Sequence, residues 1–407
     1  MLGESEPIRR CELLHRECDI ADSTGDRPAQ DAALQAVAAV LERHPDDACQ
    51  AELWFRMALL ADRRADTAAS ERLSGQAAEL AERCGAAKWA AMARGNLAYQ
   101  HFARQDCLGA DGQLVIALQW AGKIEGQDDR AETEAKLLTV SSMVARELCR
   151  FDEARATLLE VLSRGEALGA PRLQLGALDN LAILAANLGR WQESVDWAER
   201  MRALADSIGA LPRAAHADQH LALAAEALGD HETAMHRHLL GLAITRANGD
   251  RTHEVPSLQR MGVLHRERGS ASAALEWLTQ AQTLYLTLED AIGDCVAAAH
   301  AALCQTRLGP TELAGSTVDL LLQRLDDELA ERPAHKTIEL RWTCQQVLDA
   351  VGDARAASLL AQLFADVQAR ATELTHEGDR ERLIHALPVF RAIVAAHARR
   401  GEPNAAG

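Results

Sequence analysis

The chain has 407 residues and a formal net charge of −17, and aromatic residues make up only 3% of it. A general nucleic-acid binder needs a basic surface, so this acidic balance argues against direct contact with DNA or RNA. No run of 18 apolar residues occurs, and we therefore expect no membrane-spanning helix. The few aromatic residues and the low proline content are typical of a helical protein.

The cysteines give information about the compartment. There are nine of them, an odd number, and no two form a C-x-x-C pair, which predicts free thiols rather than a disulfide framework. The first residues, 1–7, lack the apolar core of a secretory leader. We therefore expect a cytoplasmic protein, and no motif in the chain calls for a cofactor.

Apolar residues recur at helical spacing between short turns, which predicts helices in antiparallel pairs. In chain order these helices are expected over 6–23 and 28–44, 48–64 and 68–84, 86–105 and 109–124, 129–148 and 152–167, 170–188 and 191–208, 212–228 and 231–248, 252–268 and 271–288, 291–308 and 311–331, and 334–351 and 354–374. A last helix, expected over 379–399, stands alone.

The turns repeat with a period of 40 residues. The first series of turn glycines consists of Gly189, Gly229, Gly269 and Gly309, and a second series, Gly169, Gly209 and Gly249, marks the other turn of the same unit. Glycine suits the left-handed position that ends a helix, because it has no Cβ to clash there. A period of this length made of helix–turn–helix units predicts an α-solenoid.

Small residues accompany the first series of turns. They stand seven residues before each glycine (Ala182, Ala222, Gly262, Ala302) and five residues after it (Ser194, Ala234, Ala274, Ala314), and one period earlier the series continues as Ser142, Cys149 and Ala154. Small side chains at these points would let the two helices of a pair approach closely. A large side chain would force them apart.

The regularity of the pattern divides the chain. Residues 1–128 are expected to form irregular helix pairs, 129–332 regular 40-residue repeats, 333–400 a helix pair with a capping helix, and 401–407 a disordered tail. The expected fold is all-α, a right-handed solenoid of about nine antiparallel helix pairs.

The repeat resembles the tetratricopeptide repeat (TPR) in a 40-residue form. The pairs Leu181-Ala182, Leu221-Ala222 and Met261-Gly262 occupy its leucine–small position, and Phe151 and Trp191 supply the aromatic residue after the turn. The chain departs from the family pattern where His231, Ala271 and Thr311 replace that aromatic residue. The resemblance implies a superhelix whose first helices line a concave surface.

A narrower resemblance concerns bacterial signalling proteins. Alanine-rich repeats with Leu-Gly-Arg and Leu-Gly-Asp turns, together with the segment 379–391, look like the sensor half of signal-transduction ATPases, including those fused to cyclase or transcriptional-activator domains. The phosphate-binding motif G-x-x-x-x-G-K-[ST] of those ATPases does not occur here. The resemblance thus implies a sensor module alone, which receives a protein or small-molecule signal and changes its superhelical shape.

Residues that face the concave surface are candidates for partner binding. Counting from the turn glycines places there Asn180, Ile183, Asn187, His220, Leu223, Glu226, Arg260, Val263, Arg266, His300 and Arg307. The three arginines offer charged hydrogen bonds to an acidic peptide, a carboxylate or a phosphate. The alternative is that they are solvated and paired with Glu226 and Glu267.

Catalytic and metal-binding patterns are weak. No nucleophile elbow or phosphate loop occurs, and acidic pairs such as Asp46-Asp47 and Asp128-Asp129 stand where aspartate caps helices. His231 and His236 are five residues apart, which does not fit a zinc-protease helix. Cys11, His15 and Cys18 share one helix face, which fits either a zinc site completed from elsewhere or a packing stripe, and packing is favoured. We expect no enzyme activity and no metal.

Together these patterns predict a regulatory module that binds a partner protein or peptide in the concave groove, in bacterial signalling or transcription control. The alternative is a sensor of a small effector that regulates an ATPase, cyclase or activator output domain. Neither interpretation includes direct contact with nucleic acid or a membrane.

Overall fold

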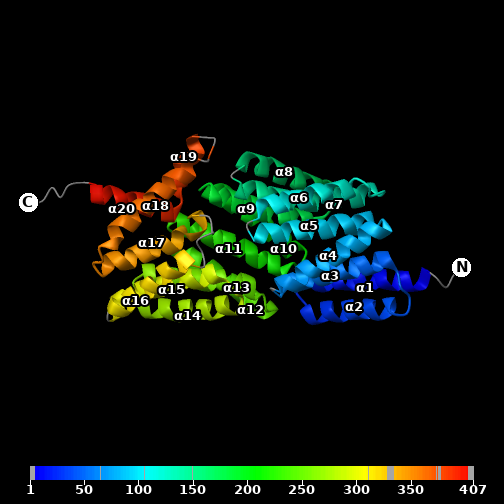
Figure 1. Ribbon diagram of the computed structural model, residues 1–407, viewed down its shortest axis with the longest axis horizontal. Coiled ribbons are helices and arrows are strands. Elements are labelled where there is room, and N and C mark those ends of the chain that lie inside the picture. The colour runs from blue at the N-terminus through cyan, green and yellow to red at the C-terminus, as the bar shows by residue number, and fades with distance from the viewer. Residues whose placement is uncertain are drawn as a thin grey trace, which may run out of the picture. The chain divides into compact units, whose positions relative to one another are not determined.

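The computed structural model describes residues 5–401 apart from 65, 105, 149, 310, 328–333, 373, 375 and 376. These residues form twenty α-helices and no strand, which confirms the all-α prediction (Figure 1). None of these helices is both long enough and apolar enough to cross a bilayer. Cys149 of the small-residue series and residues 402–407 of the expected tail lie outside the described residues.

The helices follow the expected pairs closely. The first eight are α1 (Ser5–Thr24), α2 (Arg27–Leu41), α3 (Asp47–Arg63), α4 (Thr67–Cys84), α5 (Ala87–Ala103), α6 (Cys107–Ala121), α7 (Gln127–Glu147) and α8 (Phe151–Ala167). The next eight are α9 (Pro171–Asn187), α10 (Trp191–Ser207), α11 (Leu211–Leu228), α12 (His231–Asn248), α13 (Arg251–Glu267), α14 (Ala271–Thr287), α15 (Ala291–Leu308) and α16 (Thr311–Asp327). The last four are α17 (Ala334–Ala350), α18 (Arg355–Thr372), α19 (Glu377–Ala386) and α20 (Pro388–Gly401).

The contacts divide the chain into two compact units. The first unit comprises residues up to 184 and 196–217, and the second comprises 185–195 and 218–407. The boundaries therefore fall inside α9, α10 and α11. The division at 128 and 332 describes the regularity of the sequence and stays a prediction.

The turn glycines adopt the expected backbone conformation with one exception. Positive φ angles, from 57° to 86°, occur at Gly169, Gly189, Gly209, Gly229, Gly249 and Gly269. At Gly309 the prediction is wrong, because this residue is extended, with a φ of −165°. Pro310 follows it in the sequence, and a residue before proline is driven towards extended conformations.

Aspartate side chains begin many of the helices. A carboxylate oxygen accepts a hydrogen bond from the backbone N–H three residues later at Asp26, Asp46, Asp66, Asp106, Asp230, Asp250 and Asp290. Each cap satisfies a donor that the helix itself leaves unpaired. The expected capping role is thus confirmed at Asp46. Asp128 and Asp129 instead lie within the first turn of α7, whose N-cap is Gly126.

The small residues beside the turns are buried. Exposed fractions of 0–1% occur at Ala182, Ser194, Ala222, Ala234, Ala274, Ala302 and Ala314. A methyl group at Gly262 would lie 2.6 Å from Cγ of Leu278 and 3.2 Å from the carbonyl oxygen of Ala274. Helices α13 and α14 therefore approach too closely for a larger residue, as the sequence pattern predicts.

The expected single helix over 379–399 is wrong. The structure has two helices there, α19 and α20, which meet at Pro388. Proline inside a helix lacks the N–H that would bond to the carbonyl of Ile384, and its ring would clash with that carbonyl. Pro388 instead occupies the first position of α20, where no N–H is needed.

The stripe formed by Cys11, His15 and Cys18 is part of the core. The two cysteines are 1% and 2% exposed and pack with Leu34 and Val37 of α2. Nδ1 of His15 lies 2.9 Å from the carboxylate of Glu52. Among the described residues, the ligand atoms of the stripe do not converge as a metal site requires. The packing interpretation is therefore confirmed for the cysteines.

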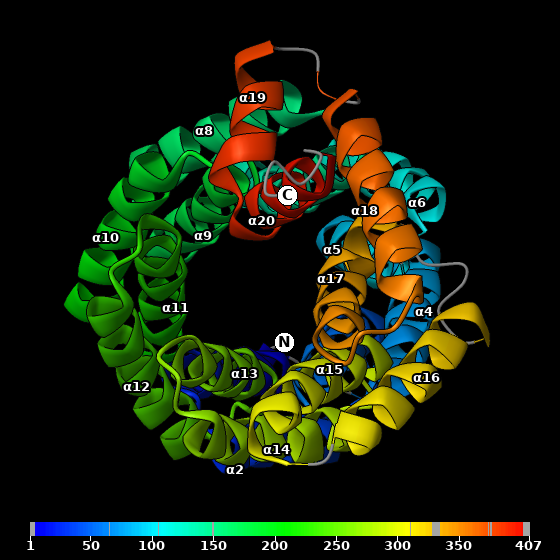
Figure 2. The ribbon, with the colours of Figure 1, turned by 90° about the vertical axis from the view of Figure 1, so that its left-hand side faces the viewer.

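The second unit has an inner and an outer layer. Figure 2 shows α13, α15 and α17 along the inner side of the arc that this unit forms, with α14, α16 and α18 outside them. The first helices of successive pairs contact one another, α13 with α15 and α15 with α17. We call the inner surface made by α13, α15, α17 and the part of α11 from residue 218 the first-helix surface.

Candidate functional site

Polar side chains connect the first helices of successive pairs, and the residues that bond to each other are separated by a constant number of positions in the sequence. Hydrogen bonds or ion pairs join residues 34 apart at Arg146–Asn180 and Asp179–Arg213 in the first unit, and at Glu226–Arg260 and Arg266–His300 in the second. The spacing is shorter than the 40-residue period. In each pair, the residue on the later helix therefore lies nearer the N-terminus of its helix than its partner does on the earlier helix. This offset defines the register of the stack.

In the second unit these contacts merge into one cluster. We call it the first-helix network, and it consists of Glu226 (α11), His238 (α12), Arg260 and Arg266 (α13), His300 (α15) and Glu339 (α17). Five of its six residues come from first helices. The network thus joins four successive first helices of the stack.

Arg260 lies at the centre of the network. Its Nε is 2.9 Å from Oε2 of Glu226 and its Nη1 is 3.3 Å from Oε1 of Glu339, while Nη2 also bonds to Glu226. Nε2 of His238 lies 2.9 Å from Oε1 of Glu226. One guanidinium therefore joins carboxylates from helices on both sides of α13.

The surroundings determine the charge of these groups. Burial alone would raise the pKa of Glu226, whose side chain is 7% exposed, but the charge of Arg260 and the hydrogen bonds from His238 and Arg260 hold it at about 2. Burial likewise opposes ionisation of Glu339, yet the bond from His300 and the charge of Arg260 lower its pKa to about 2. Both carboxylates are ionised at neutral pH.

His300 is a neutral imidazole within the network. Nη1 of Arg266 donates to Nδ1 of His300 over 2.7 Å, so Nδ1 must accept and Nε2 carries the proton towards Glu339. Burial and the neighbouring charge of Arg266 lower the pKa of His300, although the hydrogen bond to Glu339 opposes this effect. His300 thus accepts from Arg266 on one side and donates towards Glu339 on the other.

The predicted binding residues fall in both units. Asn180 and Ile183 belong to the first unit, and the other nine belong to the second. Asn180 is 9% exposed, donates to the carbonyl of Gly176 and accepts from Arg146. Ile183 is half-buried. These two residues are integrated into the packing of their own unit.

In the second unit the predicted residues differ in accessibility. Asn187, Leu223 and Arg307 are exposed, and His220 is half-buried. Val263 is only 3% exposed, so it belongs to the core and is not accessible to a partner. The close packing of α13 against its neighbours covers this side chain.

Two members of the network, His238 and Glu339, were not predicted from the sequence. His238 lies on α12, a second helix, and the family resemblance places only first helices at the concave surface. Glu339 lies after Gly309, the last glycine of the first series. The residue one 40-residue period after His300 is Leu340, which is buried. Helix α17 begins 43 residues after α15 begins and ends 42 residues after α15 ends, so the 40-residue period does not carry the column into α17.

The arginines expected to bind an anion already have partners. Arg260 pairs with Glu226 and Glu339, and Arg266 lies 3.5 Å from the carboxylate of Glu267. Arg307 donates to the carbonyl of Arg266 over 3.3 Å. The alternative stated for the sequence, pairing with Glu226 and Glu267, therefore describes this arrangement. An anionic partner would have to displace one of these carboxylates.

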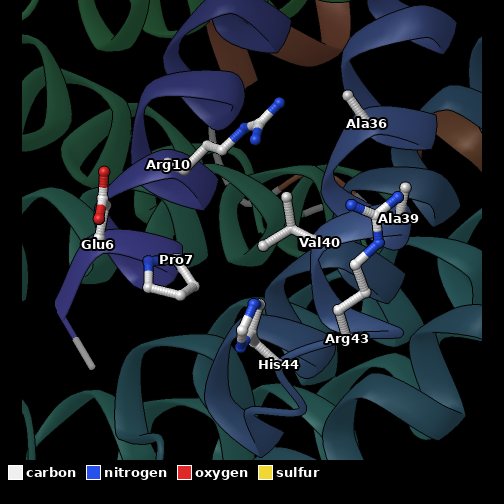
Figure 3. A pocket seen from close by; sticks show the side chains of 8 residues that line it. All are labelled: Glu6, Pro7, Arg10, Ala36, Ala39, Val40, Arg43 and His44. Carbon is white, nitrogen blue, oxygen red and sulfur yellow. The ribbon is translucent and has the colours of Figure 1, made fainter. Parts of the chain in front are cut away.

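A separate concavity lies in the first unit, between the start of α1 and the end of α2. This cleft has a volume of about 490 Å³, and its lining comprises Glu6, Pro7, Arg10, Ala36, Ala39, Val40, Arg43 and His44 (Figure 3). We call it the N-terminal cleft. Alanine and valine side chains form its apolar wall on α2, while the charged groups are exposed.

Comparison with known proteins identifies solved structures that have a similar fold. No family model matches the sequence, and no curated protein sequence is similar to it. Similarity appears only among solved structures, at low sequence identity, and it therefore concerns the fold alone.

A Rap protein in complex with Competence and Sporulation Factor is 12% identical, with a TM-score of 0.58, over 98% of this chain and 100% of that one. A signal transduction ATPase with numerous domains and a TPR sensor, from Pyrococcus horikoshii, is 11% identical, with a TM-score of 0.57, over 91% of this chain. The chain spans 55% of the length of that ATPase. NprR bound to its cognate peptide NprX is 14% identical, with a TM-score of 0.50, over 77% of this chain and 90% of that one. The chain thus has the TPR-like helical repeats that its sequence predicts.

Proposed function

We propose that the chain is a regulatory module that binds a partner protein or peptide on its first-helix surface. The supporting observation is the first-helix network, which fixes the positions of α11, α13, α15 and α17 before any partner arrives. Binding to a preformed surface avoids the cost of ordering it, so modest contacts from several helices suffice.

The structural neighbours support the same role. The Rap protein is bound to Competence and Sporulation Factor, and NprR is bound to a cognate peptide. A peptide or protein ligand on a similar helical stack is therefore our proposal for this chain, within cytoplasmic bacterial signalling. The paired state of Arg260 and Arg266 makes an uncharged or mixed-charge ligand a better fit than a strongly acidic one.

The proposal includes no catalytic step. The strongly shifted carboxylates of the network, Glu226 and Glu339, are both held ionised by arginine and histidine partners. A general acid or base needs a pKa near the working pH, which these groups lack. We therefore retain the prediction that the chain is not an enzyme.

Two leucines allow a matched test of the surface. Leu223 on α11 is 37% exposed and is predicted from the sequence to face the concave surface, whereas Leu240 on α12, a second helix, is 38% exposed. We would compare the wild type with Leu223→Asp and Leu240→Asp in crosslinking pull-downs from the native cytoplasm, followed by mass spectrometry. A partner lost at least tenfold in Leu223→Asp alone supports the proposal.

Equal retention of every captured protein in both variants would contradict the first-helix surface as the binding site. Loss in Leu240→Asp alone would place the partner on α12 instead. Circular dichroism of both variants confirms that helix content is unchanged, since both substitutions are at exposed positions.

A second candidate function, the small-effector sensor, is favoured by the N-terminal cleft. Its volume of about 490 Å³ lies in the range of small-molecule sites, and Arg10, Arg43 and His44 border an apolar wall. These groups suit an anionic effector with an apolar body. Native mass spectrometry of the purified protein would detect such a molecule, and Arg10→Ala should release it. Arg9→Ala, on the same helix but outside the cleft, is the control, and equal retention in both variants excludes the cleft.

A further inference from the structure

The C-terminal part of the second unit returns to a turn far back in the sequence. Nη2 of Arg190, in the turn between α9 and α10, lies 2.9 Å and 3.1 Å from the two carboxylate oxygens of Asp379 in α19. The residues belong to the same unit although 189 positions separate them. Helix α19 also contacts its neighbours in sequence, α18 and α20.

A second bond completes the end of α19. The indole Nε1 of Trp191 donates to the carbonyl oxygen of Ala386 over 3.0 Å. Ala386 is the last residue of α19, where carbonyls have no partner within the helix. The break at Pro388 creates this unpaired carbonyl, and the tryptophan next to Arg190 satisfies it. The helix break and the turn thus fit each other chemically.

Gly189 has a role that the other turn glycines lack. A methyl group there would lie 2.6 Å from Cβ of Ala386 and 3.2 Å from the carbonyl oxygen of Arg382. At Gly229 and Gly269, which also have positive φ angles, a methyl group would meet nothing within 4 Å. Glycine at position 189 therefore serves both the turn and the close approach of α19.

The contact is polar and contains few apolar side chains. Asp379 is 5% exposed and also accepts from Nη1 of Arg382 over 2.7 Å. Asp379 and Leu383 are the buried residues of α19. An element with few buried apolar contacts opens at low free-energy cost, and on opening the carboxylate of Asp379 and both arginines become hydrated.

We propose that the contact between α19 and the turn before α10 acts as a latch. Gly189, Arg190 and Trp191 form one side of this contact, and Asp379 and Ala386 form the other. The latch opens locally while the helix pairs between its two sides stay folded. Closed, it ties residue 190 to residue 379 and fixes the curvature of the second unit. Open, it lets that curvature change. The inference goes beyond the proposed function and does not depend on what the first-helix surface binds.

The glycines provide a matched test. Gly189→Ala and Gly269→Ala impose the same left-handed backbone strain, at φ angles of 66° and 82°, but only the first disturbs the latch. In hydrogen–deuterium exchange of the full chain, we expect residues 379–386 to exchange at least tenfold faster in Gly189→Ala than in Gly269→Ala. Exchange in α13 and α15 should be the same in both variants.

Equal protection of 379–386 in the two variants would overturn the proposal, as would loss of protection throughout the second unit in Gly189→Ala. A charge exchange provides an independent measurement. Arg190→Asp should speed exchange in α19, and the double variant Arg190→Asp with Asp379→Arg should restore protection. Failure of the double variant to restore it, with the remaining helices intact, shows that the ion pair does not hold the latch.

Small-angle scattering then measures the consequence. The opened variant, Gly189→Ala, should have a larger radius of gyration than Gly269→Ala under identical conditions. Identical scattering curves, with α19 shown to be open by exchange, would overturn the claim that the latch fixes the curvature.

Discussion

Arg260 forms an ion pair with Glu226, 34 residues earlier, with its Nε 2.9 Å from Oε2 of the carboxylate. The same spacing joins Arg266 to His300 in this unit and Asp179 to Arg213 in the other. These polar pairs are 34 residues apart, whereas the repeat period is 40 residues. Their common spacing indicates that side chains on the first helices define the register between repeats. Apolar packing alone would permit several registers, because alanine side chains offer little shape.

The first prediction concerns the stability provided by Arg260. The variant Arg260→Ala leaves the ionised, largely buried Glu226 without its main partner, and removal of one member of such a pair costs about 3 kcal/mol. Urea unfolding followed by circular dichroism measures the loss. The solvent-exposed pair Arg355–Asp353 is the control, since Arg355→Ala should lower the unfolding midpoint much less than Arg260→Ala does.

Equal losses in the two variants would show that the network contributes no more than a surface ion pair. The result also decides which residues suit a binding test. Arginine variants of the network would alter stability together with the surface, and for this reason the matched leucines are the better probes.

The second prediction concerns acid. The pKa of Glu226 is about 2 in the folded protein against 4.5 for an unperturbed glutamate, so the unfolded chain binds the proton more tightly. The stability that this group provides is therefore complete above about pH 5 and is lost as the pH falls towards 2. In Glu226→Gln this contribution is absent at every pH.

The difference in melting temperature between wild type and Glu226→Gln should accordingly shrink from pH 6 to pH 3. Other carboxylates titrate in both proteins, and the comparison cancels their effect. A difference that stays constant over this range would mean that the pKa of Glu226 is not lowered by folding.

The third prediction uses two glycines inside helices. Alanine is the better helix former, so Gly315→Ala in α16, where a methyl group meets nothing within 4 Å, should stabilise the protein by about 0.5–1 kcal/mol. Gly262→Ala should instead destabilise it by about 1–3 kcal/mol, because the methyl group would press on Leu278 and the carbonyl of Ala274. Denaturant unfolding of both variants tests the sign. Stabilisation by both would show that α13 and α14 can move apart freely.

The fourth prediction tests the helix-pair register at the equivalent position of the preceding repeat. Ala222 is fully buried, and Ala222→Trp should overpack the contact and cost about 1–3 kcal/mol or more. Hydrogen exchange should show the loosening first in α11 and α12. An unchanged unfolding midpoint would argue against the register described here.

Helix ends were predictable where capping aspartates and turn glycines follow the repeat. Within the regular repeats the expected helix 231–248 matches α12 at both ends, because Asp230 caps its start and Gly249 ends it in the left-handed conformation. The repeat pattern does not hold where a proline imposes its own constraint on the backbone. Gly309 is extended before Pro310, and Pro388 divides the last helix into α19 and α20.

The candidate site was predictable only in part. The column counted from the glycines found Glu226, Arg260, Arg266 and His300, which the structure brings into one network. It did not find His238 or Glu339, and it included Val263, which is covered. The period gives a residue's place in its repeat, but the accessibility of that residue depends on how closely the neighbouring helices pack.

The sequence by itself determined the helices, their pairing and the repeat, because helix caps, turn glycines and apolar spacing act over a few residues and need no distant partner. Only the tertiary structure decided that Arg260 bridges Glu226 and Glu339, and that Asp379 meets Arg190. Those contacts join residues 34, 79 and 189 positions apart. They depend on the accumulated geometry of every intervening helix pair, and a local pattern contains no information about that sum.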